Sequence, residues 1–299
     1  MRTRFTLFAV PLIVALAAAA CGTATPSPSG TPSPSGPDGS TGPSTGFRLR
    51  VTTVQALPPL DMFSWTPQIL ITDDLIAVQG GAIPLIFPGP LVMPLVGARL
   101  TEEAWARIVS EAKAAGLLSG NGDFTGGGLP PGAAAARLQL VVEGRLFDLT
   151  GDPGRVAFCG ETLCRPEPGT PEAFATFVSL LGDLRGWLGA GVGAQAPWTP
   201  AAYAVLVGPP PPDNEGLAVG PRPWPFENGA AEFGESLTGQ PDRRCGIVSG
   251  AEAAAFAAAL ENATQLTTWR DPALADPVGL TVRPLLPGDD DPCAPLVGG

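Results

Sequence analysis

The pattern of apolar and polar positions predicts three amphipathic helices, at residues 101–116, 170–188 and 249–263. In each segment, apolar side chains recur three and four positions apart, as the buried face of a helix requires. The first two segments open on a threonine, whose hydroxyl can accept a hydrogen bond from the first free backbone N–H groups. The third opens on Ser249, with Glu252 three positions later, which is the spacing of a capping box.

Short apolar runs between these helices predict strands. Residues 69–72 and 75–78 flank a two-residue turn, and so do residues 138–142 and 145–149, so each pair is expected to form a hairpin. Because short strands alternate with three helices, the sequence predicts an α+β fold in which antiparallel hairpins pack against three amphipathic helices. Further strands are expected at residues 49–54, 203–207, 246–248 and 280–285.

Residues 1–20 have the pattern of an export signal peptide. Two arginines precede an apolar run that is shorter than the about 20 residues of a membrane-spanning helix. The following stretch, from Ala18 to Cys21, resembles the lipobox of bacterial lipoproteins, in which the cysteine thiol is acylated with fatty acids such as palmitate. This resemblance implies a lipid anchor on Cys21. The alternative is ordinary secretion after Ala20, which leaves Cys21 unmodified.

Residues 21–46 are rich in Pro, Ser and Gly, and the hexapeptide TPSPSG occurs twice in tandem. Such a composition offers little to bury, so we expect a disordered tether that follows the lipidated cysteine. The rest of the chain is expected to form an α+β subdomain at 47–189 and a second one at 190–299, because a Gly/Ala/Pro stretch lies at that boundary. One continuous domain is the alternative.

Two further segments carry a resemblance to known proteins. They read GARLTEEAWARIVSEAKAAGLL at 97–118 and LGDLRGWLG at 181–189. Together with the Cys-then-Ser/Pro leader, they resemble a group of uncharacterised lipid-anchored secreted proteins of high-GC Gram-positive bacteria. The resemblance implies a place on the extracytoplasmic face of the cell membrane and a shared ectodomain. It brings no catalytic motif.

Four cysteines follow Cys21 in the sequence. Export would place them in an oxidising compartment, so two disulfides are expected, for which three pairings exist. Cys159 and Cys164 are close enough in sequence to close a local turn, which would leave Cys245 to pair with Cys293. A zinc site is the rival interpretation, but neither pair has the C-x2-C spacing of such sites, and we expect no metal and no cofactor. The four residues are Cys159, Cys164, Cys245 and Cys293.

Composition argues against several classes of function. The formal net charge is −11, so nucleic acid would be repelled and no nucleic-acid partner is expected. The chain has no histidine, which removes the Ser-His-Asp and Cys-His catalytic arrangements. Residues 42–46 spell G-x-S-x-G within the expected tether, and Ser110 to Lys113 spell S-x-x-K in a predicted helix without the companion motifs. Both matches are interpreted as chance, and no catalytic residue is assigned.

Carboxylates are the acid/base groups that remain in quantity. Asp289, Asp290 and Asp291 form the densest cluster, which we interpret as a solvated turn rather than a calcium site, because no D-x-D-x-D-G loop accompanies it. A glycoside hydrolase needs two carboxylates at a suitable separation in space, and the sequence singles out no such pair.

Three of the six tryptophans lie in proline-rich loops. A tryptophan in a loop can stack on a sugar ring, although it can equally pack on neighbouring prolines. We therefore expect a non-catalytic, membrane-anchored module that binds an envelope polysaccharide or another exported protein. The alternative is a carboxylate-based hydrolase that acts on envelope glycan. The candidate ligand-stacking residues are Trp65, Trp198 and Trp224.

Overall fold

The computed structural model describes one compact unit of the chain, within Thr41–Gly299. The side chains at positions 159, 162 and 163 are not described. The predicted signal peptide at 1–20, the predicted lipidation site Cys21 and nearly all of the predicted tether at 21–46 lie outside the described residues. The described residues are 46–298, apart from 84, 86, 130, 131, 157, 160, 161, 164, 214, 215 and 219.

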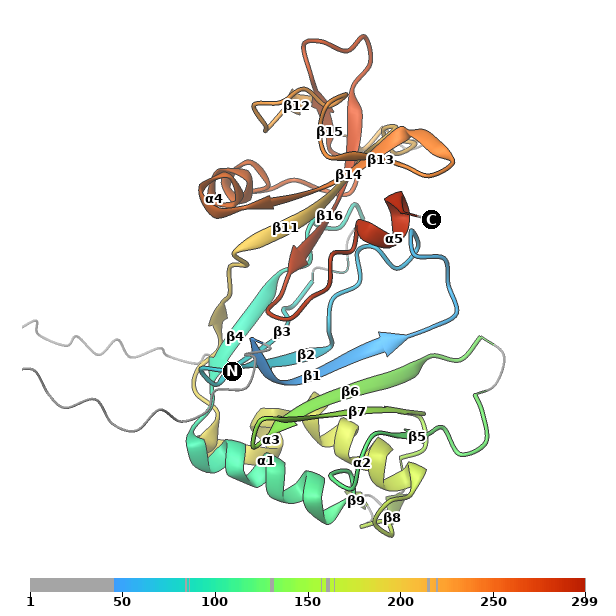
Figure 1. Ribbon diagram of the computed structural model, residues 1–299. Coiled ribbons are helices and arrows are strands. Elements are labelled where there is room, and N and C mark those ends of the chain that lie inside the picture. The colour runs from blue at the N-terminus through green and yellow to red at the C-terminus, as the bar shows by residue number, and fades with distance from the viewer. Residues whose placement is uncertain are drawn as a thin grey trace, which may run out of the picture. The chain divides into compact units, whose positions relative to one another are not determined.

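The larger of two main sheets has eight strands in the order β10–β4–β3–β2–β1–β6–β7–β5 (Figure 1). Neighbouring strands are antiparallel except for β5, which runs parallel to β7. Both predicted hairpins are present, as β2–β3 and β6–β7. The strands are β1 (Phe47–Val54), β2 (Ile69–Thr72), β3 (Ile76–Gly80), β4 (Leu95–Arg99), β5 (Gly122–Phe124), β6 (Ala135–Val142), β7 (Arg145–Gly151) and β10 (Ala196–Pro197).

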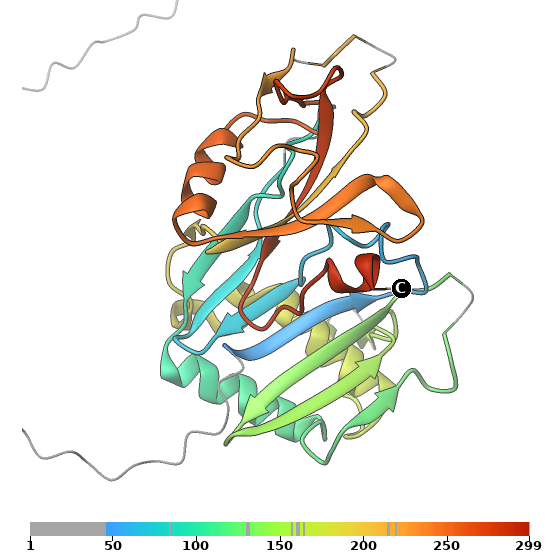
Figure 2. The same cartoon turned by 45° about the horizontal axis from the view of Figure 1, so that its top comes forward.

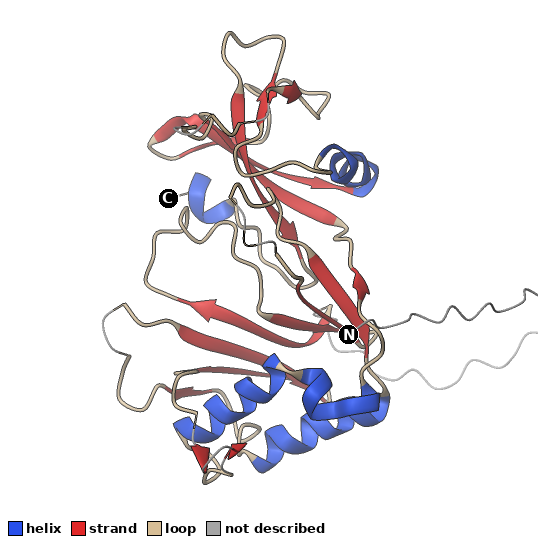
Figure 3. Cartoon of the chain, turned by 180° about the vertical axis from the view of Figure 1, so that it is seen from behind, coloured by secondary structure: helices blue, strands red, loops and turns tan. Residues whose placement is uncertain are grey.

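Helices α1 (Glu102–Ala114), α2 (Pro171–Gly182) and α3 (Leu184–Leu188) cover one face of this sheet (Figure 3). The hydroxyl of Thr101 accepts a hydrogen bond from the backbone N–H of Ala104 at 3.1 Å, as the sequence predicts. The predicted continuous helix over 170–188 is wrong, because the Asp183 carboxylate accepts the backbone N–H of Gly186 and starts a new helix.

The smaller sheet has six strands in the order β12–β15–β16–β11–β14–β13. Its central strand β11 pairs antiparallel with β14 and β16, whereas β12 and β15 are parallel. Helix α4 (Gly250–Ala259) follows β14, and the serine that precedes it makes no side-chain cap, so the predicted capping box is wrong. The remaining elements are β8 (Phe158–Cys159), β9 (Thr162–Leu163), the 3-10 turn η1 (Gly189–Gly191), β11 (Ala202–Gly208), β12 (Arg222–Pro223), β13 (Glu235–Leu237), β14 (Gln240–Ser249), β15 (Thr268–Arg270), β16 (Val278–Leu285) and α5 (Ala294–Val297).

The predicted fold class is wrong: the described part of the chain is mostly β, with two mixed sheets and short helices. Several strands escaped prediction because they are short and contain Pro, Gly or charged residues, which conceal the alternation of a half-buried strand. The third predicted helix is also only weakly amphipathic. It is largely alanine, and Ala253 and Phe256 are its buried residues.

A buried carboxylate in the segment that follows β16 connects the two sheets, because it pairs with an arginine of each sheet. The Asp289 carboxylate, only 2% exposed, lies 2.7 Å from a guanidinium nitrogen of Arg50 on β1 and 3.3 Å from one of Arg283 on β16. It also accepts the backbone N–H of Leu286 at 3.0 Å. Figure 2 shows this C-terminal segment in red beside β1 in blue. The solvated turn predicted for the Asp289 cluster is therefore wrong for Asp289 itself.

Candidate ligand-binding site

A pocket of about 350 Å³ lies where the residues that lead into β4, the β10–β11 loop and the end of α4 meet. We call it the Trp198 pocket. Its walls are mainly apolar, and the described residues that line it include no lysine or arginine. A concave, mostly apolar cavity with a few polar groups is the usual form of a small-ligand site. Its lining includes Met93, Trp198, Pro200, Tyr203, Leu260 and Glu261.

Trp198 is held in place by the edge of the larger sheet. Its backbone N–H donates to the carbonyl of Leu95 at 2.9 Å. Its side chain lies directly on Gly97 of β4, since a Cβ atom at that position would be 3.1 Å from Cδ1 of the indole. A larger residue at Gly97 would push the ring away. The half-buried indole is thus a fixed wall of the pocket rather than a loosely placed surface group.

Tyr203 on β11 forms another wall and is the single tyrosine of the chain. The residue is only 4% exposed, and its ring meets that of Phe256 edge to face, with centroids 5.6 Å apart. Burial raises the pKa of the Tyr203 phenol, so the hydroxyl stays protonated at neutral pH. Among the described residues this hydroxyl has no hydrogen-bond partner. Because the hydroxyl oxygen is not fully buried, it is open to the pocket, where a ligand can hydrogen-bond to it.

The polar groups of the Trp198 pocket suit a ligand with both an apolar face and hydroxyls. The indole offers a flat apolar surface, Tyr203 offers a hydroxyl, and the exposed Glu261 at the end of α4 offers a carboxylate that accepts hydrogen bonds. With a carboxylate and no cation in the lining, an anionic ligand is disfavoured. A neutral sugar ring combines these properties.

The other two candidate tryptophans lie elsewhere. The indole N–H of Trp224 donates to the carbonyl of Asn228 at 2.6 Å, and its ring packs edge to face on Phe226 and Phe233. Trp65 is half-buried in a turn between β1 and β2, where its backbone N–H donates to Met62. Of the three, Trp198 is the residue that lines the pocket described above.

The cysteines bear on stability rather than on the pocket. A disulfide joins Cys245 of β14 to Cys293, with the two Cα atoms 5.5 Å apart, which confirms the pairing predicted by elimination. It ties the C-terminal segment to the smaller sheet. Cys164 and the side chain of Cys159 lie outside what the structure describes.

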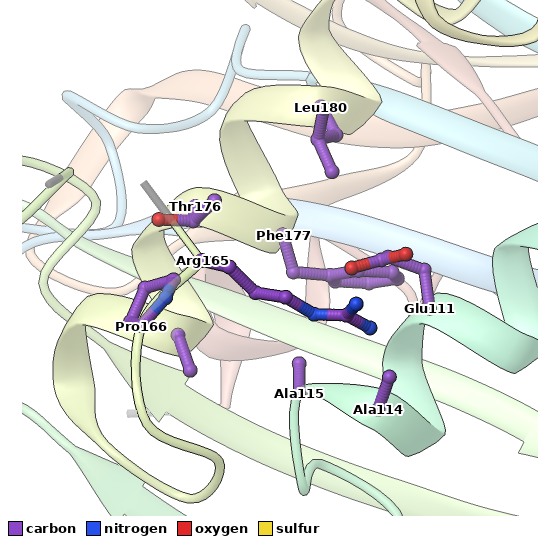
Figure 4. A pocket seen from close by; sticks show the side chains of 9 residues that line it. Glu111, Ala114, Ala115, Arg165, Pro166, Thr176, Phe177 and Leu180 are labelled. Atoms are coloured by element: carbon purple, nitrogen blue, oxygen red, sulfur yellow. The ribbon is translucent and has the colours of Figure 1, made fainter. Parts of the chain in front are cut away.

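A second cavity of about 270 Å³ lies between α1 and α2 (Figure 4). Arg165 reaches from the loop before α2 toward Glu111 of α1, beside the ring of Phe177. The Thr176 hydroxyl in its lining is buried and has no hydrogen-bond partner within the part of the chain that the structure describes. This cavity has opposite charges on its walls but lacks an aromatic indole face for a sugar.

A third, more open groove of about 630 Å³ runs between α1 and the β6–β7 turn. Ser110 and Lys113, the residues of the S-x-x-K match, both line it. The groove also contains Trp105, but the guanidinium carbon of Arg48 lies 5.6 Å from the centroid of that ring. The chain's own cation therefore already occupies a face of this indole.

The structure does not strengthen the case for carboxylate catalysis. The side-chain hydrogen bond from Arg137 lowers the pKa of Asp148, which is the opposite of what a catalytic acid needs. Among the described residues, no group of three or more Cys, Asp or Glu side chains is placed to hold a metal ion.

The described helices include none with the length and apolar character needed to cross a bilayer. Sequence reasoning singled out Trp198 but missed Tyr203 and Glu261 as its neighbours, because the three residues come from separate segments.

No family model, curated protein or solved structure matches the chain.

Proposed function

We propose that the chain is a membrane-anchored, extracytoplasmic module that binds envelope polysaccharide in the Trp198 pocket and does not hydrolyse it. The observation that carries the proposal is the pairing of a fixed indole face with the Tyr203 hydroxyl, which opens to the pocket and has no hydrogen-bond partner among the described residues. A sugar ring packs its C–H face on an indole and directs hydroxyls to the neighbouring polar groups.

The size of the pocket favours a sugar over a protein partner. A volume of about 350 Å³ falls in the range of small-ligand sites. A protein partner would instead need an extended surface of roughly 800 Å² on each side. The glycan would therefore be recognised through one or two of its rings.

The location rests on the sequence of the leader. Acylation at Cys21 would attach the chain to the membrane, and firm attachment requires more than one acyl chain. A Pro/Ser/Gly tether of 25 residues could extend about 75 Å, enough to reach into a surrounding wall layer. Mass spectrometry of the mature N-terminus tests this part, because an unmodified Cys21 would contradict it.

Binding is tested by titrating the folded chain with neutral oligosaccharides released from the cell envelope. Trp198→Ala is expected to raise Kd at least about 30-fold, since it removes the stacking surface. Tyr203→Phe removes only the hydroxyl and is expected to raise Kd about fivefold. Trp65→Ala is the matched control and should leave Kd unchanged.

Two results would contradict the proposal. The first is a Kd that is the same for the unmodified chain and for Trp198→Ala, or no binding of any oligosaccharide at saturating protein. The second is the appearance of new reducing ends in the mixture, because it would establish the hydrolase alternative.

A further inference from the structure

The connection between β3 and β4 belongs to a segment without a single polar side chain. From Gly80 to Ala98 the sequence contains only Gly, Ala, Ile, Pro, Leu, Phe, Val and Met. In the first half of this segment, Leu85 is fully exposed, Phe87 is 62% exposed and Ile83 is 38% exposed. Large apolar side chains that lie close together on a surface usually mark a site of contact with another molecule or a membrane. We call these three residues the loop tip.

The base of the connection is fixed to the rest of the fold, so the loop tip is presented by an ordered support. Gly81 donates its backbone N–H to the carbonyl of Pro94 at 2.8 Å. Leu91 donates to Ala263, and Gln265 donates back to Gly89, at 2.9 and 3.0 Å. Leu91 also packs against the core of the smaller sheet.

The chemistry of the segment favours lipid over a protein surface. A protein interface normally carries about one hydrogen bond per 100–200 Å², and this segment has no side chain that can form one. Its prolines at 84, 88, 90 and 94 also lack a backbone N–H. The segment therefore has fewer backbone donors that would lose their hydrogen bonds to water on entering hydrocarbon. Both ends of the connection return to the larger sheet, so it can dip into a bilayer but not cross it.

We propose that the loop tip inserts among the acyl chains at the surface of a phospholipid bilayer. The loop tip itself lies outside the Trp198 pocket, although the same connection supplies Met93 to the pocket wall. The contact does not require the anchor at Cys21. Because the loop tip carries no charge on a chain of net charge −11, its insertion depends on the hydrophobic effect and not on anionic headgroups.

The test uses the full chain carrying Cys21→Ser, with Leu85→Cys or Phe87→Cys labelled with an environment-sensitive fluorophore. The probe is a vesicle of phosphatidylcholine, without and with nitroxide groups on the lipid acyl chains. Ile247→Cys, at a residue 44% exposed on the smaller sheet, is the matched control. The same chain without an added cysteine gives the background from other thiols.

We expect vesicles to shift the emission of both loop labels to the blue and the nitroxides to quench them, with no response at position 247. Adding Leu85→Ser to the labelled Phe87→Cys chain is expected to raise, about tenfold, the lipid concentration at which the fluorescence change reaches half of its maximum. The response should persist at high salt.

The proposal would be overturned by equal responses at positions 85 and 247, by no response at all, or by a response that high salt abolishes. It would also be overturned if the loop labels shifted with rising protein concentration in the absence of vesicles, since the partner would then be a second copy of the chain. Because sugar binding is measured separately, failure here leaves the proposed function untouched.

Discussion

The two main sheets are stabilised in different ways. The larger sheet buries a continuous aliphatic face under α1, α2 and α3. The smaller sheet has one alanine-rich helix beside it and relies on an aromatic cluster of Phe226, Phe233 and Phe256. It also has the Cys245–Cys293 disulfide. Both sheets join residues distant in sequence, but only the larger one buries its face under three helices, whereas the smaller one combines a single helix with an aromatic cluster and a disulfide.

The largest expected effect comes from the core of the larger sheet. Phe174 is fully buried and its ring stacks on Phe124, with centroids 5.5 Å apart. Phe174→Ala is expected to lower the free energy of unfolding by about 3–5 kcal/mol, measured by urea denaturation. Leu146→Ala, at an exposed residue of the same sheet, is the control and should cost less than about 0.5 kcal/mol. Similar losses in the two variants would contradict the proposed core.

Removing the disulfide tests the smaller sheet. The double change Cys245→Ser and Cys293→Ser opens a loop of sequence separation 48 and is expected to cost about 2–4 kcal/mol. Hydrogen exchange should accelerate in β11 and β14 more than in β1 and β6, because the link belongs to the smaller sheet. Equal acceleration in both sheets would mean that the two regions do not differ as described.

The buried charges between the sheets should couple the two regions. Asp289→Asn keeps the shape of the side chain but leaves Arg50 and Arg283 without the buried negative charge. We expect a loss of about 2–3 kcal/mol in the free energy of unfolding, with faster hydrogen exchange in β1 and β16 together. Asp276→Asn, at an exposed residue, serves as the control. Loss of protection in only one sheet would refute the coupling.

The smallest effect compares two helix starts. Thr101 caps α1 through its hydroxyl, whereas Ser249 before α4 makes no side-chain cap. Thr101→Ala is therefore expected to cost about 1 kcal/mol and Ser249→Ala only a few tenths, as measured by thermal unfolding. If the two changes cost the same, the described difference between the two helix starts is wrong.

Local patterns in the sequence were enough to predict part of the fold. The helix after Thr101 and the β6–β7 hairpin follow from the spacing of apolar residues over a few positions, and the Cys245–Cys293 pair follows from elimination. The two-residue strand β10 was missed, because an edge strand that contains proline shows no alternation.

Contacts between residues far apart in the sequence could not be predicted from local patterns. Asp289 belongs to a run of three aspartates that looks solvated, and only the arrival of Arg50 from the far end of the chain explains its burial. The Trp198 pocket is similar, since Trp198, Tyr203 and Glu261 come from separate segments that only the folded chain brings to one cavity. The exposed loop tip did have a signal in the sequence, namely 19 successive residues, 80–98, without a polar side chain.

The ratio of two dissociation constants tests the central claim most directly. The affinity of neutral envelope oligosaccharides is measured for Trp198→Ala and for Trp65→Ala under the same conditions. If the Trp198 pocket is the binding site, Kd for the first variant is at least about 30-fold higher than for the second. A ratio of one would show that the pocket does not hold the glycan.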